Sequence, residues 1–397
     1  MEFIERKLSS RLLEAARHFP ALVLAGPRQT GKTTLLRHLF PTHHYVTLDR
    51  PLVAEQAEED PESFLASHPP PVLIDEVQYA PRLFRFLKIR IDEQRDAKGQ
   101  FILTGSQKFT LMQGVSESLA GRVGVFDFEG LSFLELVESG KLQDRPEAIA
   151  SFMLRGGFPE LWQDLDRPID VYLDSYIATY LERDVKQVLA VGSLRDFERF
   201  LRACALRSGQ QLNKSDLARD VGISVPTASQ WLGVLVALGQ VHLLEPWFGN
   251  LTKRLVKSPK LYLAEPAIMA YLCGINENSL SSSPLAGALW ETLVFAELRK
   301  QLSYVAPRKK LWYYRDQSQI EADFVIESAT DLELLECKWT SVPTRSMGSN
   351  LDKIANIFEA GSSLFKVTKK KLVSRAPDVI DREGLSYVSL LRGLLDR

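Results

Sequence analysis

The sequence reads Gly26-Pro27-Arg28-Gln29-Thr30-Gly31-Lys32-Thr33 near its N-terminus, which fits the phosphate-loop pattern G-x-x-x-x-G-K-[ST]. Residues 21–25 before it are apolar and strand-like, and residues 33–40 after it are typical of a helix. The pattern requires this strand–loop–helix order, because backbone N–H groups in the turn must point at phosphates. The sequence therefore predicts a nucleotide-binding loop in an α/β domain, with Lys32 on the β and γ phosphates and the Thr33 hydroxyl on Mg²⁺.

A second apolar run, residues 71–74, ends in two acids, Asp75 and Glu76. An acid at the end of a strand beside the loop can reach the metal through water, so we expect Asp75 to help hold Mg²⁺. We expect Glu76 to be the base that orients the attacking water. A strand that merely ends in solvated charges is the alternative, and the preceding phosphate loop disfavours it. A third strand, residues 101–104, leads to Ser106, which is either a sensor of the γ-phosphate or part of a simple turn.

The composition is that of an ordinary soluble globular protein. The chain has 397 residues, of which 45% are hydrophobic and 25% charged, and its formal net charge is −1. No overall field draws it to nucleic acid or membrane, so any nucleic-acid site must be a local patch. The three cysteines are far apart in the sequence, which fits free thiols in a reducing cytoplasm. We find no signal peptide and no apolar run long enough to cross a bilayer, so we expect a cytoplasmic protein without membrane contact.

Four domains are expected along the chain. Strands alternating with helices predict a parallel sheet covered on both faces. A helical stretch follows it as a lid or connector, then a segment with a different pattern, and the run Ser281-Ser282-Ser283-Pro284 has the composition of a linker. The predicted domains are a phosphate-loop domain (1–145), a helical connector (146–207), a winged helix-turn-helix (208–280) and a C-terminal α/β domain (285–397).

The winged-helix prediction rests on a helix–turn–helix–strand–strand order. Gly222 lies in the tight turn between the predicted helices 214–220 and 225–238, and residues 240–244 and 260–263 are predicted as the strands of the wing. In DNA-binding examples the second helix enters the major groove and the wing touches phosphate. The predicted DNA contacts are Thr227, Ser229 and Gln230 on the second helix and Lys253, Arg254, Lys257 and Lys260 in the wing. The alternative is a winged helix that mediates only protein contacts.

The last domain contains a possible second active site. A helix with Glu291 precedes strands that carry Asp323 and the sequence Glu336-Cys337-Lys338. Residues two apart in a strand share a face, so Glu336 and Lys338 point the same way and Asp323 can join them. Such carboxylates with a lysine can bind Mg²⁺ and activate water for phosphodiester cleavage. The alternative is a solvated strand, and two further acids, at positions 321 and 333, compete for the role.

With these motifs the chain resembles, nearly end to end, the prokaryotic AAA-type ATPases that join an ATPase core to a C-terminal domain of unknown function. The tail, with Asp323, Glu336 and Lys338, resembles the restriction-endonuclease-like fold and its PD-(D/E)xK signature. The stretches that carry the AAA resemblance are Gly26–Thr34, Leu48-Asp49-Arg50-Pro51, Ile74-Asp75-Glu76, Leu103-Thr104-Gly105-Ser106, Leu119-Ala120-Gly121-Arg122, Leu154-Arg155-Gly156-Gly157-Phe158-Pro159-Glu160 and Leu181-Glu182-Arg183-Asp184-Val185.

The resemblance implies that residues Gly26–Thr34 bind ATP and that Mg²⁺-dependent hydrolysis follows. It also implies a homo-oligomer, because AAA proteins usually place the nucleotide at a subunit boundary that a neighbour's arginine completes. Arg122 is the first candidate for that arginine, ahead of Arg183 and Arg155, and a structural ion pair is the alternative for each. Three hypotheses follow: an ATPase that acts on DNA, an ATP-gated DNA nuclease, and a nucleotide-dependent switch that binds a protein partner without DNA.

Overall fold

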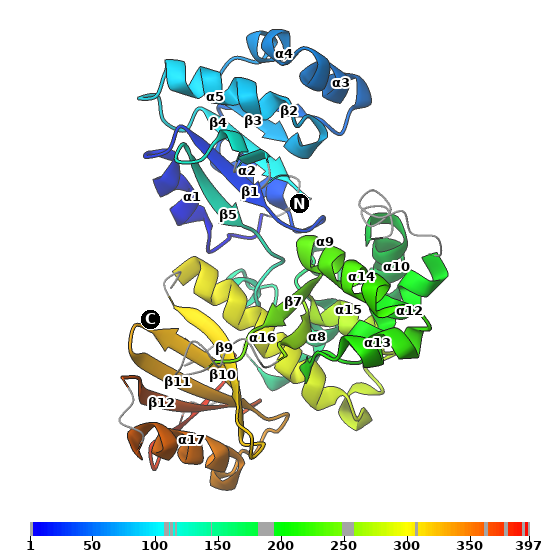
Figure 1. Cartoon of the computed structure of the whole chain (residues 1–397), viewed down its shortest axis with the longest axis vertical. Helices are drawn as coiled ribbons and strands as arrows, with labels where there is room; N and C mark the ends of the chain where they lie inside the picture. The colour runs from blue at the N-terminus through cyan, green and yellow to red at the C-terminus, as the bar shows by residue number, and fades with distance from the viewer. Residues whose placement is uncertain are drawn as a thin grey trace. The chain divides into compact units, whose positions relative to one another are not determined.

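The structure, a computed structural model, forms two compact units (Figure 1). Unit 1 contains residues 1–131, 158–163 and 237–239, and unit 2 contains residues 132–157, 164–236 and 240–397. The residues described are 3–106, 111, 114–115, 117–143, 145–181, 194–247, 258–305, 309–360, 364–376, 380–390 and 394–395.

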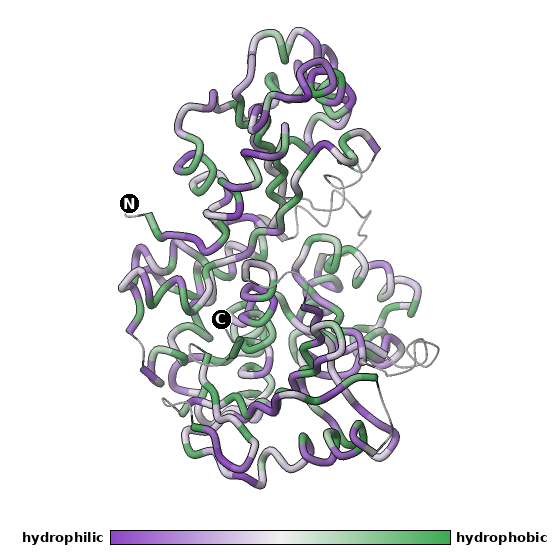
Figure 2. The backbone as a smooth tube through the Cα atoms, turned by 90° about the vertical axis from the view of Figure 1, so that its left-hand side faces the viewer, coloured by the Kyte–Doolittle hydropathy of each residue, from purple (hydrophilic) through white to green (hydrophobic). Residues whose placement is uncertain are grey.

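Unit 1 is built on a five-stranded sheet with the strand order β2-β3-β4-β1-β5, in which all neighbouring strands are parallel. All residues of β1 and β4 are buried, as expected for central strands covered on both faces. Hydrophobic residues accordingly follow the central strands in Figure 2. The strands are β1 Ala21–Ala25, β2 His44–Thr47, β3 Val72–Asp75, β4 Phe101–Gly105 and β5 Val123–Asp127. The helices are α1 Ser9–Ala16, α2 Lys32–Leu39, α3 Pro51–Glu59, α4 Pro61–Ser67, α5 Leu83–Glu93 and α9 Pro159–Gln163, with a 3₁₀ turn at Val77–Tyr79.

Unit 2 begins with helices and contains the expected pair of helices around a tight turn. Gly222 adopts the left-handed conformation at φ 82° after α13, and the Ser224 hydroxyl accepts a hydrogen bond from the backbone N–H of Thr227 at 3.1 Å at the start of α14. The conformation of Gly222 agrees with the tight turn predicted between the two helices, and Ser224 caps the second of them. The helices are α7 Phe133–Glu138, α8 Pro146–Arg155, α10 Ile169–Tyr176, a π-helical turn Ile177–Leu181, α12 Leu194–Ala205, α13 Lys214–Val221, α14 Val225–Ala237 and α15 Pro266–Leu272.

Two sheets complete unit 2. The small sheet has the order β6-β8-β7, with β6 Gln210–Gln211, β7 Val241–Leu244 and β8 Lys260–Leu263. The larger sheet is mixed and has the order β13-β14-β12-β11-β10-β9. Its elements are α16 Ala286–Val305, β9 Lys310–Arg315, β10 Glu321–Ser328, β11 Asp331–Cys337, α17 Ser349–Ala360, β12 Lys366–Val373, β13 Ile380–Arg382 and β14 Leu385–Val388, with 3₁₀ turns at Leu280–Ser282 and Arg345–Gly348.

The two sheets of unit 2 are joined through the backbone. The N–H of Trp247, just beyond β7, donates to the carbonyl of Tyr313 in β9 at 2.6 Å, and the N–H of Tyr313 donates to the carbonyl of Glu245 at 3.2 Å. The ring of Tyr262 in β8 stacks on Phe295 of α16, with ring centroids 4.1 Å apart. The segment predicted as a wing and the C-terminal domain therefore share one core, whereas the sequence analysis predicts two separate domains.

None of the helices in the described part of the chain combines the length and hydrophobicity that a membrane crossing requires.

Candidate functional site

The phosphate loop lies between β1 and α2, and each of its glycines has a structural reason. A Cβ atom on Gly26 would lie 1.9 Å from the backbone oxygen of Phe128, so only glycine fits against the chain that follows β5. Gly31 has φ 90°, a left-handed conformation that glycine adopts without strain, and α2 begins at the next residue, Lys32. The glycines that define the sequence pattern thus shape the turn and set the start of the helix.

The side chain of Lys32 folds back onto the loop. Its buried ammonium donates hydrogen bonds to the carbonyls of Gly26 at 2.8 Å and Pro27 at 2.7 Å. The Thr30 hydroxyl also donates to the carbonyl of Pro27, at 2.9 Å, and Arg6 donates to the carbonyl of Thr30 at 3.1 Å. A positive charge is therefore held within a tightly cross-linked turn at the N-terminus of α2, where anions bind well.

Asp75 is the centre of an oxygen-rich cluster at the end of β3. The Thr33 hydroxyl lies 3.1 and 3.0 Å from its two carboxylate oxygens, and the Tyr45 hydroxyl donates to Oδ2 at 3.0 Å. The hydroxyl of Thr104 in β4 donates to Oδ1. Burial first, and then the charge of Asp75, raise the pKa of Tyr45 to about 12, so this phenol keeps its proton. The structure thus brings together Thr33 and Asp75, the two residues predicted to hold Mg²⁺.

Glu76 follows in the left-handed conformation, at φ 57°, and its carboxylate is buried. Its Oε2 accepts hydrogen bonds from the Ser106 hydroxyl at 2.9 Å, from the Ser106 backbone N–H at 3.2 Å and from the Gln78 amide. Burial opposes its ionisation, but Lys32 and the bonds from Gln78 and Ser106 outweigh burial and lower the pKa of Glu76. Glu76 is therefore ionised at neutral pH, as a general base must be, and Ser106 contacts that base.

The sequence did not single out Tyr45, Gln78 or Thr104. A signal for Thr104 exists, because Ile74 pairs with Leu103 in the parallel sheet, which makes Asp75 and Thr104 the next residues at the same edge. The contact of Tyr45 with Asp75 depends on how far the tyrosine side chain extends from β2, and no sequence pattern indicates that contact. The 3₁₀ turn at Val77–Tyr79 places Gln78, and nothing local to the sequence indicates it.

The candidate arginines have partners of their own within the described residues. Arg122 makes a bidentate ion pair with Asp92, with its Nε 2.6 Å from Oδ1 and its second terminal nitrogen 2.9 Å from Oδ2. Arg155 donates to the carbonyl of Leu165 at 2.8 Å. Arg183 lies outside the described residues. The geometry within one chain thus matches the structural ion-pair alternative for Arg122, and its role in a neighbouring subunit stays a prediction.

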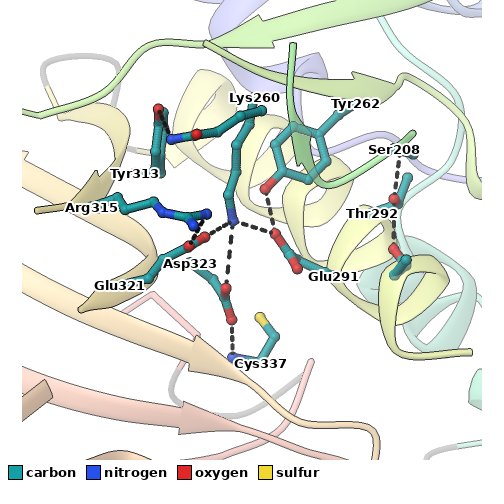
Figure 3. Close-up of polar contacts among 12 residues, drawn as sticks. Ser208, Lys260, Tyr262, Glu291, Thr292, Tyr313, Arg315, Glu321, Asp323 and Cys337 are labelled. Carbon is teal, nitrogen blue, oxygen red and sulfur yellow. Dashed lines mark hydrogen bonds and ion pairs between the residues drawn. The ribbon is translucent and has the colours of Figure 1, made fainter. Parts of the chain in front are cut away.

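The second predicted site contains a residue that the sequence placed elsewhere (Figure 3). The Lys260 ammonium lies 2.9 Å from Oε1 of Glu291, 2.5 Å from Oε1 of Glu321 and 3.6 Å from Oδ1 of Asp323. Burial by itself would lower the pKa of Lys260, but Glu291, Asp323 and Glu321 outweigh burial and raise it. Tyr262, also in β8, donates to Oε1 of Glu291 at 2.6 Å. We name this group of Lys260, Glu291, Glu321 and Asp323 the lysine–carboxylate cluster.

The cluster corrects the prediction for Lys260. Its side chain is only 3% exposed and faces three carboxylates, so it is not part of an exposed basic surface in this structure. Lys253, Arg254 and Lys257 lie outside the described residues. On α14, Gln230 is exposed as expected, whereas Thr227 and Ser229 are half-buried.

Glu336 and Lys338 lie beside the cluster and interact with each other. The Lys338 ammonium is 2.7 Å from Oε1 of Glu336, as their shared strand face predicts. Within the described residues, the buried Oε2 of Glu336 has no hydrogen-bond partner. Burial and then the nearby charge of Asp323 raise the pKa of Glu336 to about 8. The competing acid Glu333 is taken up elsewhere, by ion pairs to two other lysines.

Three families match this chain in succession. Residues 18–137 match an AAA domain. Residues 146–279 match a domain of unknown function, DUF8612, and residues 286–383 match another, DUF4143.

The chain is similar to two mycobacterial proteins, the uncharacterized protein Mb2031c of Mycobacterium bovis and the uncharacterized protein Rv2008c of Mycobacterium tuberculosis. Each is 33% identical over 355 residues, which cover 88% of this chain and 77% of the relative. Among solved structures, the Walker-type ATPase paby2304 of Pyrococcus abyssi is similar, with a TM-score of 0.47 and 19% identity over 68% of this chain and 96% of that one.

Proposed function

Because this chain belongs to the family that includes Mb2031c and Rv2008c, and because residues 18–137 form an AAA-type ATPase domain, we propose that it binds ATP and hydrolyses it with Mg²⁺. One observation carries the proposal. The Lys32 ammonium, the Thr33–Asp75 pair and the buried carboxylate of Glu76 converge at the ends of parallel strands β1 and β3.

The donor set fits Mg²⁺, which prefers oxygen ligands and keeps several of its waters. The Thr33 hydroxyl and the Asp75 carboxylate supply such oxygens, and the remaining ligands would be water and phosphate oxygens. When bound, the ion would neutralise charge that develops on the transferring phosphoryl group. Lys32 would contact the β and γ phosphates, the amides of Gly26–Thr34 would surround them, and Glu76 would take the proton of the attacking water.

Isothermal titration calorimetry of the full chain with ATP and with ADP, each with and without Mg²⁺, tests this proposal. We expect saturable uptake of both nucleotides, with ATP binding strengthened by Mg²⁺ because Thr33 and Asp75 are already within hydrogen-bonding distance of each other. Absence of any uptake by folded protein, as judged by circular dichroism, would contradict the proposal.

We also propose that the α13–turn–α14 segment is a winged helix that engages DNA. The capped start of α14 and the exposed Gln230 support it. However, α14 has no charged residue between Val225 and Ala237, and Lys260 is buried. We therefore propose that electrostatic attraction to phosphate comes from the segment that carries Lys253, Arg254 and Lys257.

Neutralising that segment is the test. The triple variant Lys253→Ala, Arg254→Ala, Lys257→Ala is expected to weaken duplex DNA binding and to reduce the slope of log affinity against log salt by about three, since each phosphate contact contributes roughly one. Fluorescence anisotropy at several salt concentrations measures both quantities. Arg85→Ala, Lys88→Ala, Arg90→Ala on α5 is the matched control, because it removes the same charge from another exposed surface. Equal affinity for the two triple variants would remove this segment from the proposal.

A specific observation favours the protein-partner alternative. Val225 and Val236 on α14 are 41% and 36% exposed, and a helix with exposed apolar residues and no charge suits a protein surface better than a phosphate backbone. Wild-type protein that binds ATP but shows no DNA affinity even at low salt would support this alternative.

A homo-oligomer in which Arg122 completes a neighbour's ATP site also belongs to the proposal, and it requires the Arg122–Asp92 pair to open.

A further inference from the structure

In the C-terminal domain, the carboxylates that could bind a divalent cation already surround an ammonium group of the chain itself. Glu291 comes from α16, Glu321 and Asp323 come from β10, and the ammonium of Lys260 lies among them (Figure 3). The Lys260 side chain is 3% exposed, and those of Glu291 and Asp323 are 17% and 13% exposed. The lysine therefore occupies the interior of the cluster and does not lie at its rim.

The second oxygens of Asp323 and Glu321 are also engaged. Oδ2 of Asp323 accepts the backbone N–H of Cys337 at 2.7 Å, and Oε2 of Glu321 accepts Arg315 at 3.0 Å. The Lys260 ammonium already occupies the space among these oxygens that a divalent ion would need, and two positive charges placed there together would repel strongly. The residues present therefore do not fit the Mg²⁺ that the PD-(D/E)xK resemblance implies. Consistent with this, among the residues described no three or more His, Cys, Asp or Glu side chains are arranged so that they could hold a metal ion.

Lys260 is fixed in this position by its strand. It pairs with Gln211 of β6 on one side and with Leu244 of β7 on the other, because β8 is the central strand of the small sheet. Its ammonium also lies 5.6 Å from the centre of the Tyr313 ring. Strand pairing therefore fixes the backbone of Lys260 beside the C-terminal domain, and the ion pairs hold its ammonium among the carboxylates.

We infer that Lys260 takes the place of a divalent cation in the lysine–carboxylate cluster, so that this nuclease-like site joins the small sheet to the C-terminal domain and does not cut DNA. The positive charge of Lys260, from β8, offsets part of the negative charge of the carboxylates on α16 and β10. The ATP hydrolysis proposed above does not depend on this inference, since it uses residues of unit 1.

The test titrates Mn²⁺ into wild type and into Lys260→Met, both without nucleotide. Calorimetry and electron paramagnetic resonance measure the Mn²⁺ that binds. Each protein is also measured with Asp323→Asn added, so that only the Mn²⁺ binding that needs Asp323 is counted. We expect none in wild type. We expect such binding to appear in Lys260→Met, because the repelling charge is gone while the carboxylates remain. The matched control is Lys371→Met, which removes another buried lysine of the same domain from its ion pair with Glu333 and should gain no Mn²⁺ binding.

Stability gives a second readout. Without metal, Lys260→Met should lower the melting temperature by roughly 10 °C, because it leaves buried carboxylates without their cation. Mn²⁺ should recover part of that loss in Lys260→Met and leave the melting temperature of wild type unchanged.

The inference is overturned if wild type binds Mn²⁺ or cuts DNA in a way that Asp323→Asn abolishes. It is also overturned if folded Lys260→Met and wild type respond equally to Mn²⁺. Should Lys260→Met fail to fold, the comparison of wild type with Asp323→Asn still decides.

Discussion

Replacing Glu76 with glutamine is expected to leave ATP binding unchanged and to slow ATP turnover by about 100- to 10,000-fold, the usual contribution of a positioned general base. The amide has the size of the carboxylate and its oxygen can still accept from Ser106, so the loop and the ends of β3 and β4 should keep their shape. It cannot take a proton from water. Binding measured by calorimetry and phosphate release measured under single-turnover conditions separate the two effects.

The structure provides a matched control for this variant. Glu93→Gln at the end of α5 makes the same chemical change at an exposed side chain whose contact is an ion pair to Arg90. It should turn over ATP at the wild-type rate. Wild-type turnover in Glu76→Gln would show that another group activates the water, and the lowered pKa of Glu76 would then reflect only its surroundings.

Replacing Lys32 with alanine is expected to weaken ATP binding by roughly 10- to 100-fold, the equivalent of losing one or two charge-assisted hydrogen bonds to phosphate. The variant also removes the bonds that Lys32 makes to the carbonyls of Gly26 and Pro27, so part of the effect comes from a loosened loop. Calorimetry with ATP, ADP and AMP identifies the cause, because a lost contact to the β and γ phosphates should weaken ATP most and AMP least.

Lys98→Ala is the control for the lysine. It removes the same charge from an exposed position in the same unit, where the ammonium bonds only to the backbone oxygen of Arg95 among the contacts of the described residues. Its ATP affinity should match that of wild type. If Lys32→Ala kept wild-type affinity for ATP, the residues 26–33 would not be a nucleotide-binding loop.

Local features of the fold were predictable because each depends on a few consecutive residues. The apolar run at residues 21–25 became β1, and the predicted helix at residues 214–220 ends one residue later in the structure, as α13. Gly31 and Gly222 both adopt the left-handed conformation at the turns where the sequence placed them. Asp75 and Glu76 ended up beside the loop because parallel strands present their carboxyl ends at one edge of the sheet.

Non-local contacts were the part that could not be predicted. The sequence around Lys260 contains several basic residues, a pattern that favours an exposed wing, and nothing nearby indicates that its ammonium meets Glu291, Glu321 and Asp323. The same holds for the pairing of Arg122 with Asp92. The sequence around an arginine does not show whether it completes the ATP site of a neighbouring subunit or forms an ion pair within its own chain. These pairings depend on the packing of elements that are distant in sequence.

The backbone hydrogen bonds between residues 245–247 and Tyr313 bear on how such chains can be recombined. The linker composition near residue 283 suggests a point at which one C-terminal domain could be exchanged for another. An exchange there would leave residues 245–247 and Lys260 in contact with the sheet of a different protein. The unit that can be exchanged therefore extends back to about residue 210, and a viable chimaera would have to carry β6, β7 and β8 together with the tail.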